Sequence, residues 1–90
     1  MPRISKQKEL KISEQILYYL FTISPEQKFT SDIAKELARD EEYTKKILQI
    51  LKKSSLVVEI KKNPQGVTYL KRQRWRLSEG AFQIYKKHQQ

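Results

Sequence analysis

Residues 40–56 read DEEYTKKILQILKKSSL, and this stretch predicts a capped, amphipathic helix. Asp40 suits the N-cap position because its carboxylate can accept hydrogen bonds from the free amides of the first turn. Glu41 and Glu42 add negative charge at the positive end of the helix dipole. One face repeats at helical spacing and consists of Thr44, Ile47, Leu48 and Leu51. Taken alone, the stretch favours an ordinary helix with a solvated, lysine-rich face.

The composition favours a polyanionic partner. The 90 residues suffice for one domain with a modest core, and they carry 19 Lys or Arg against 10 Asp or Glu, a net charge of +9. DNA, RNA and, less readily, an anionic membrane surface attract such a chain. The charge is uneven, because residues 52–76 hold eight basic side chains and a single acidic one. General solubility explains such clustering less well than it explains a scattered excess.

Several other classes of function are disfavoured. The chain has no cysteine, which excludes disulfides, thiolate metal sites and a cysteine nucleophile and fits a cytoplasmic protein. Its one histidine, His88, lies near the C-terminus, where a solvated side chain is the ordinary outcome. No glycine-rich phosphate loop is present, and no apolar run approaches the roughly 20 residues of a membrane span. We therefore expect no catalytic residues, metal, cofactor or small-molecule ligand, and no membrane insertion.

The N-terminal part of the chain predicts an arm followed by a long helix. Residues 1–8 suit a flexible basic arm, which could also follow a phosphate backbone or enter a minor groove, and residues 9–90 form the expected domain. A helix is predicted from about Lys8 to Thr22. Its segment 16–21 is apolar or aromatic throughout, so a second cover is needed, either the C-terminal helix or another copy of the chain. The candidate contacts of a homodimer are Tyr18, Tyr19, Phe21, Phe82 and Tyr85.

Two further segments complete a group of three helices. Proline and polar residues at 24–28 predict a loop, since they break the periodicity. A short helix is then predicted from about Ser31 to Arg39, capped by Thr30 or Ser31. The first helix, this short one, a tight link at 39–40 and the helix of 40–56 make the pattern of a tri-helical helix-turn-helix.

The remaining residues predict a β-hairpin and a last helix. Residues 57–62 and 67–70 suit strands, and Asn-Pro-Gln-Gly at 63–66 is typical of a type I turn. Further along, Trp75 and Leu77 alternate with arginines, so the apolar pair should pack on the helices while the arginines face outward. The arms are unequal, which leaves the register open to a bulge. Ser78 can cap a helix from Glu79 to about His88, which Gly80 in its first turn weakens.

These elements and their motifs resemble the winged helix-turn-helix family of DNA-binding domains, of the small archaeal or MarR- or PadR-like regulator type. The likeness covers about residues 8–88 and rests on FTSDIAKEL at 29–37, IL-x-x-LKK at 47–53, LV at 56–57 and WRLSEG at 75–80. It implies an α+β, mostly α fold with a three-helix core, a two-stranded wing and a C-terminal helix. Three features depart from the family pattern. Ser55 stands where glycine is usual, the segment 77–80 is one residue short, and Glu41 and Glu42 stand where DNA often approaches.

The resemblance implies a DNA-binding transcriptional regulator with helix 40–56 in the major groove and the wing on the backbone. The chemistry of the side chains makes Lys45, Lys46 and Gln49 the best base-edge candidates, since Lys can bond guanine and Gln adenine. Thr30 and Ser31, at a helix start, suit a phosphate, while Tyr43 could contact DNA or be a partly buried aromatic. The other candidate DNA contacts are Lys52, Lys53, Lys61, Lys62, Asn63, Gln65, Lys71, Arg72, Arg74 and Arg76.

The expected partners are double-stranded DNA and a second copy of the chain, with a cytoplasmic, nucleoid-associated location. Two alternatives remain open. The first is a non-specific architectural protein associated with chromatin or the ribosome, which the lysine-rich wing and the acidic start of helix 40–56 favour. The second is a protein-interaction winged helix in a larger complex, in which Glu41 and Glu42 meet a basic partner.

Overall fold

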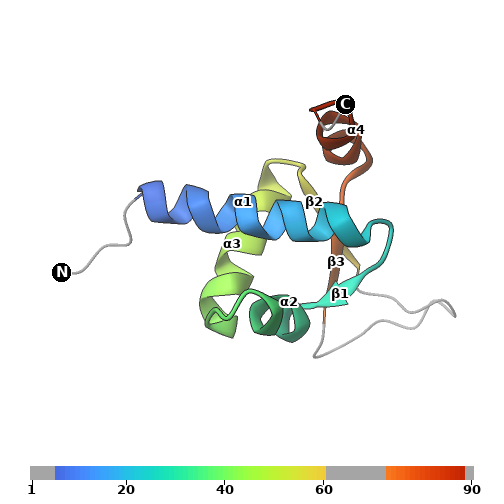
Figure 1. The fold of residues 1–90 in the computed structure, drawn as a ribbon. Helices are drawn as coiled ribbons and strands as arrows, with labels where there is room; N and C mark the ends of the chain where they lie inside the picture. Colours follow the sequence, from blue (N-terminus) through green and yellow to red (C-terminus); the bar gives the residue numbers. More distant parts are fainter. Residues whose placement is uncertain (1–5, 61–72, 89–90) are drawn as a thin grey trace, which may run out of the picture.

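The computed structural model describes residues 6–60 and 73–88 (Figure 1). In chain order the elements are α1 (Lys6–Ile23), β1 (Lys28–Phe29), α2 (Thr30–Glu36), α3 (Glu41–Lys53), β2 (Val57–Ile60), β3 (Arg74–Leu77) and α4 (Glu79–His88). The mostly helical α+β architecture predicted from the sequence is confirmed. Residues 6–8 of the expected arm belong to α1, and residues 1–5 lie outside the described residues. The predicted turn at 63–66 and strand at 67–70 also lie outside them.

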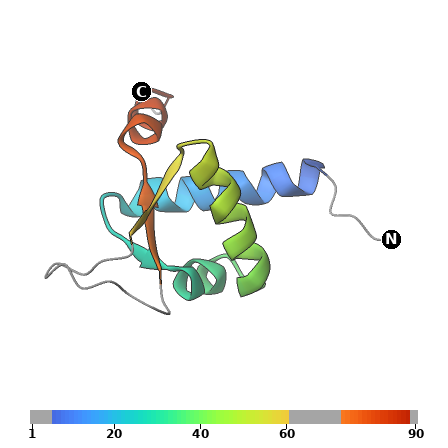
Figure 2. The ribbon, with the colours of Figure 1, turned by 180° about the vertical axis from the view of Figure 1, so that it is seen from behind.

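The predicted start and buried face of α3 are both confirmed. The Asp40 carboxylate accepts a hydrogen bond from the backbone N–H of Tyr43 at 2.9 Å, so it caps the helix. The buried residues are Thr44, Ile47, Leu48 and Leu51. Figure 2 shows α3 and the sheet on one side of α1, and the side chains between them form the core. From α1 this core takes Ile12, Ile16 and Leu20, which are almost completely buried.

The sheet has three antiparallel strands in the order β1-β3-β2. Trp75 and Leu77 of β3 point into the core, with exposed fractions of 0% and 2%. Arg74 and Arg76 alternate with them on the outer face, as the sequence predicted. The edge strand β1 was not predicted, because Lys28 and Phe29 alone carry no alternating pattern. Pairing with β3 makes this dipeptide a strand.

The last helix, α4, begins and ends where the sequence predicted. Ser78 Oγ accepts a hydrogen bond from the backbone N–H of Ala81 at 3.1 Å, which caps the helix. The Phe21 ring of α1 lies 5.4 Å from both the Phe82 ring and the Tyr85 ring of α4. The C-terminal helix therefore packs on the second apolar side of α1, which was one of the two alternatives predicted from the sequence. It projects from the body on the side of α1 opposite α2 (Figure 1).

The predicted bounds and cap of α2 were wrong. Phe29, whose side chain has no acceptor, occupies the N-cap position, so the helix has no side-chain cap. The predicted cap Thr30 is the first helical residue, and its hydroxyl accepts a hydrogen bond from Trp75 Nε1 at 2.8 Å. The helix ends at Glu36 rather than Arg39, since Ala38 adopts a left-handed φ of 54°. The Arg39 and Ala38 amides then donate to the carbonyls of Ala34 and Lys35, which is the hydrogen-bond pattern of a Schellman motif.

The same ending recurs at the end of α3. Ser55 adopts a left-handed φ of 60°, and the Ser55 and Leu56 amides donate to the carbonyls of Lys52 and Leu51. Ser55 is the residue that stands where the resembled family usually has glycine. Its backbone conformation is the one for which glycine is preferred at a helix end, so this departure changes the side chain and leaves the turn in place.

Candidate nucleic-acid interface

The outward face of α3 carries the predicted base-edge candidates together. Lys45 and Lys46 are exposed and Gln49 is half-buried, one turn further along the helix. Neither lysine has an ion pair or a hydrogen bond to another described side chain. Lysine side chains on an exposed helix face can donate to guanine O6 and N7 or to phosphate oxygens. The arrangement therefore supplies two free donors and one amide on a single stripe.

The first turn of α3 balances these cations. Glu41 and Glu42 are exposed and precede Lys45 and Lys46 by four residues each. Residues four apart are neighbours on a helix surface, so each lysine has a carboxylate one turn before it. The outward face of the first two turns is therefore close to neutral, and the cations that attract a polyanion lie nearer the C-terminal end of α3 and beyond.

Lys52 is engaged within the chain. Its Nζ lies 2.7 Å from Glu59 Oε1 in β2, in an ion pair that was not predicted from the sequence. The Lys52 side chain is 44% exposed and that of Glu59 only 2%. Lys53, its neighbour, is exposed and has no ion pair within residues 6–60 and 73–88. Of the two predicted DNA contacts in the last turn of α3, Lys53 is therefore the one whose charge is available to a partner.

The root of the wing presents Arg74 and Arg76 on the outer face of the sheet. The Arg74 guanidinium carbon lies 5.2 Å from the centre of the Phe29 ring, in a cation–π contact that orients the arginine. Arg76 Nη1 donates to the carbonyl of Leu77 at 3.1 Å. The other predicted wing contacts lie outside the described residues, and they are Lys61, Lys62, Asn63, Gln65, Lys71 and Arg72.

The remaining predicted DNA contacts are turned partly or wholly into the protein. Thr30 is 7% exposed and its hydroxyl is bonded to Trp75, while Ser31 is half-buried. Tyr43 is half-buried, and its hydroxyl oxygen is buried without a hydrogen-bond partner among the described residues. Burial raises the pKa of Tyr43, nearby Glu9 raises it further, and Arg39 lowers it. Tyr43 is therefore the partly buried aromatic that was one of its two predicted roles.

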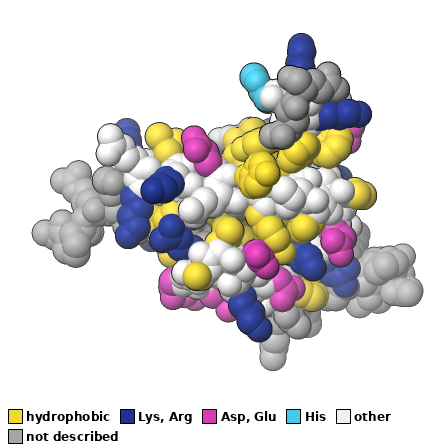
Figure 3. Space-filling model, in the orientation of Figure 1, with side chains coloured by type: hydrophobic (Ala, Val, Ile, Leu, Met, Phe, Trp, Pro, Cys, Tyr) yellow, Lys and Arg dark blue, Asp and Glu magenta, His cyan; other side chains and the backbone are white. Residues whose placement is uncertain are grey.

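Of the five candidate dimer residues, three pack within the chain, Tyr19 is half-buried and Tyr18 is exposed. Phe21, Phe82 and Tyr85 pack on one another within the chain, and burial raises the pKa of Tyr85. Tyr18 is 54% exposed, and Ile84 of α4, which was not predicted, is 56% exposed. In Figure 3, hydrophobic side chains form a band from the base of α4 across the face that α1 presents. Acidic side chains lie at the lower edge, where Figure 1 places α2 and the lower end of α3, and lysine or arginine side chains stand beside them.

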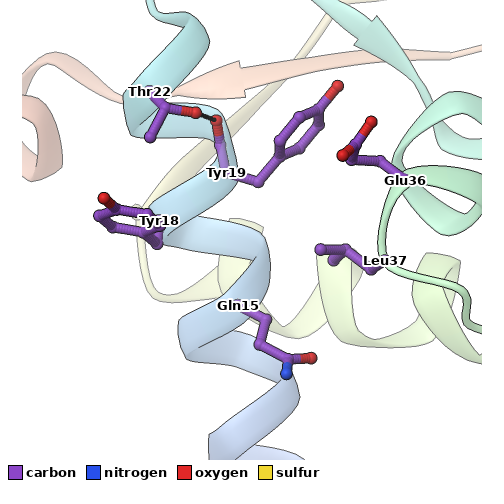
Figure 4. Close-up of a pocket in the computed structure, with 6 residues that line it drawn as sticks. All are labelled: Gln15, Tyr18, Tyr19, Thr22, Glu36 and Leu37. Carbon is purple, nitrogen blue, oxygen red and sulfur yellow. Dashed lines mark hydrogen bonds between the residues drawn. The ribbon is translucent and has the colours of Figure 1, made fainter.

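A groove of about 400 Å³ separates α1 from the end of α2 (Figure 4). Its lining consists of Gln15, Tyr18, Tyr19, Thr22, Glu36 and Leu37. Burial raises the pKa of Tyr19, Lys28 lowers it, and Glu36 is among the carboxylates that raise it. Its one acidic residue and lack of lysine or arginine make this groove unsuited to a polyanion. No local pattern of residues indicated this groove, because it forms only where two helices meet.

The described part of the chain has neither a metal centre nor a membrane-spanning helix. No group of three or more His, Cys, Asp or Glu side chains there is arranged to hold a metal ion. None of the described helices combines the length and apolarity needed to cross a bilayer.

The arrangement of the described elements is similar to that of several solved structures. A MepR mutant from a multidrug-resistant S. aureus clinical isolate is 22% identical, with a TM-score of 0.65 over 89% of this chain and 59% of that one. The adhesin competence repressor (AdcR) from Streptococcus pyogenes is 20% identical, with a TM-score of 0.65 over 93% and 58%. A MepR mutant from S. aureus bound to an oligodeoxyribonucleotide is 20% identical, with a TM-score of 0.64 over 91% and 66%.

This chain spans less than two thirds of the length of each of these proteins. No protein-family model matches the sequence, and no curated protein matches it significantly. At such identities the likeness establishes the fold. Three packed helices, a strand pair at the wing root and a following helix make this chain a winged helix-turn-helix domain.

Proposed function

We propose that this chain is a DNA-binding transcriptional regulator that places α3 in the major groove and its basic wing on the backbone. The observation that carries the proposal is the joint placement of two exposed lysines and a glutamine on the outward stripe of α3. Arginines of the wing root and the cation-rich sequence between β2 and β3 supply positive charge for phosphates. The likeness in fold to a protein solved with an oligodeoxyribonucleotide supports the same assignment.

The test is binding to labelled duplexes across a salt series, with random DNA and with a sequence recovered by in vitro selection. Binding should weaken as salt rises, with a slope of about −0.9 per neutralised phosphate in a plot of log K against log salt. A regulator should hold the selected site roughly 10³-fold or more tighter than random DNA. Absence of duplex binding at low salt would overturn the proposal.

A matched pair of variants tests the role of α3. Lys45→Gln with Lys46→Gln removes two charges from its outward stripe, and Lys86→Gln with Lys87→Gln removes two from exposed positions on α4. The first pair should weaken binding to the selected site at least about tenfold and relax its specificity. The second should change binding little. Equal losses from both pairs would mean that only net charge matters.

A second candidate, a non-specific architectural protein, is favoured by one observation. Glu41 and Glu42 stand one turn before the candidate base readers and have no ion pair within the described residues. Carboxylates there repel phosphates, although one can accept from a cytosine amino group. The ratio of selected-site to random-DNA affinity decides between the candidates, since an architectural protein gives a small ratio and a steep salt dependence.

We also propose that the regulator is a homodimer that buries the hydrophobic band of α1 and α4. Tyr18 of α1 and Ile84 of α4 are exposed hydrophobic residues, and α4 projects on the side of α1 opposite α2, which leaves α3 open to DNA (Figure 1). Light scattering should give about twice the 10.8 kDa of one chain. Ile84→Glu should lower the mass to that of a monomer, whereas Gln83→Glu, its exposed neighbour, should not. A nucleoid-associated, cytoplasmic location follows from the proposed DNA binding.

A further inference from the structure

Glu59 occupies a position where an apolar residue would be expected. It shares the inner face of β2 with Val57, and it lies opposite the fully buried Trp75 in the register of β2 and β3. Its side chain is 2% exposed. A buried carboxylate is strongly unfavourable unless a partner compensates its charge. The single acidic residue of the cationic stretch 52–76 therefore points inward.

Lys52 supplies that compensation from the last turn of α3. Its Nζ donates to Glu59 Oε1 at 2.7 Å, while Oε2 is buried and has no hydrogen-bond partner among the described residues. The ion pair joins the last turn of α3 to β2, and the left-handed turn at Ser55 lies between them in the chain. The carboxylate is buried and the lysine is half-exposed. Loss of Lys52 therefore destabilises the fold more than loss of Glu59, because it leaves a buried charge without a partner.

A second polar contact is made by Trp75, the residue paired with Glu59 across the two strands. Trp75, the register partner of Glu59, donates its indole N–H to Thr30 at the start of α2. Two neighbouring positions on the inner face thus fix the sheet to both helices of the helix-turn-helix, one to α3 and one to α2. Together these contacts fix β2 and β3 against α3 and α2.

From this geometry we infer that the Lys52–Glu59 ion pair is a clamp that orients β2 and β3, the strands at the wing root, relative to α3. Lys52 is then a positioning residue for DNA binding and makes no phosphate contact of its own. The inference rests on the proposed DNA-binding function. It separates two adjacent lysines that look equivalent in the sequence, because Lys53 is exposed and unpaired within the described residues.

The experiment compares Lys52→Gln, Glu59→Gln, the double variant and the control Lys53→Gln in the full chain. Duplex affinity is measured across a salt series. Lys53→Gln should make the slope of log K against log salt shallower by about 0.9, as expected for one lost phosphate contact. Lys52→Gln and Glu59→Gln should each weaken binding roughly tenfold without changing the slope, and the double variant should be no weaker than Lys52→Gln alone.

Urea unfolding of the same four proteins provides a readout that does not require DNA. Lys52→Gln should lower the unfolding midpoint more than Lys53→Gln, because it leaves a buried carboxylate without a partner. Adding Glu59→Gln should restore part of that loss. Effects of the two clamp substitutions that simply add would overturn the ion pair as a structural contact.

The results distinguish a failure of the clamp inference from a failure of the proposed DNA-binding function. If wild-type protein binds duplex and Lys52→Gln makes the slope shallower as much as Lys53→Gln does, Lys52 contacts phosphate and the inference is wrong. If wild-type protein binds no duplex, the proposed function fails. The positioning role for DNA then fails with it, and the unfolding cycle alone decides whether the clamp exists.

Discussion

The hydrogen bond between Trp75 and Thr30 gives the sharpest single prediction. Thr30→Val keeps the shape of the side chain and removes the acceptor of the Trp75 indole N–H, a contact of 2.8 Å between residues 45 positions apart. Trp75 is 0% exposed, so water cannot replace the lost acceptor without opening the core. An orphaned buried donor costs about 1–3 kcal/mol, and we expect about 2 kcal/mol here. In a domain of this size that lowers Tm by roughly 8–16 °C.

The assay uses the intrinsic fluorescence of Trp75, the one tryptophan in the chain. Urea unfolding followed at this residue should show a lower midpoint for Thr30→Val and an unchanged slope m, because the surface exposed on unfolding stays the same. Thr22→Val is the matched control. The Thr22 hydroxyl donates to the Tyr19 carbonyl at 2.7 Å on an exposed surface, so its loss should stay within about 0.5 kcal/mol.

Two results would refute this reasoning. Equal stability of Thr30→Val and Thr22→Val would show that the buried hydrogen bond contributes nothing. Weaker DNA binding by Thr30→Val with unchanged unfolding would show that the hydroxyl serves a phosphate, as the sequence suggested, rather than Trp75.

Three further substitutions or conditions test other parts of the structure. Ser55→Gly should stabilise the fold by about 1 kcal/mol by relieving the left-handed backbone at φ 60°, whereas Ser54→Gly, at φ −87°, should not; urea midpoints compare them. Gly80→Ala should strengthen α4 by about 0.5–1 kcal/mol, since an added Cβ meets nothing within 4 Å, and a lower midpoint would contradict this. The free energy of unfolding, measured as a function of pH, should stay unchanged around neutrality and fall above about pH 10. Burial raises the pKa of three tyrosines in the folded state, so the folded chain holds these protons more tightly than the unfolded chain, and that contribution disappears as pH rises through the folded pKa. The three tyrosines are Tyr19, Tyr43 and Tyr85. A free energy of unfolding that stays constant up to pH 12 would contradict this contribution.

Local signals in the sequence predicted the elements in which neighbouring residues and tertiary contacts agree. Asp40 caps α3, the apolar stripe of that helix is its buried face, and Ser78 caps α4. The alternation around Trp75 predicted which face of β3 is buried, because successive side chains of a strand point to opposite sides. In these segments the pattern of the chain alone was sufficient.

The contacts that the sequence could not predict join residues far apart or lack a local pattern. Thr30 looked like a cap, but a tryptophan 45 residues away takes its hydroxyl. The strand β1 exists only through its pairing with β3. A signal for Glu59 was present, since it lies two residues after Val57 on the same strand face and is the one acidic residue in a basic stretch. Its partner, Lys52, became identifiable only from the packing of α3 on β2.

The measurement that tests the central claim most directly is mapping of amide chemical shifts as a selected duplex is added to the labelled protein. We expect the changes to cluster on the outward face of α3, at Lys45, Lys46 and Gln49, and at the wing root around Arg74. The hydrophobic band of α1 and α4 should change little. Changes confined to α1 and α4, with α3 unaffected, would contradict the assignment of α3 and the wing as the DNA-binding surface.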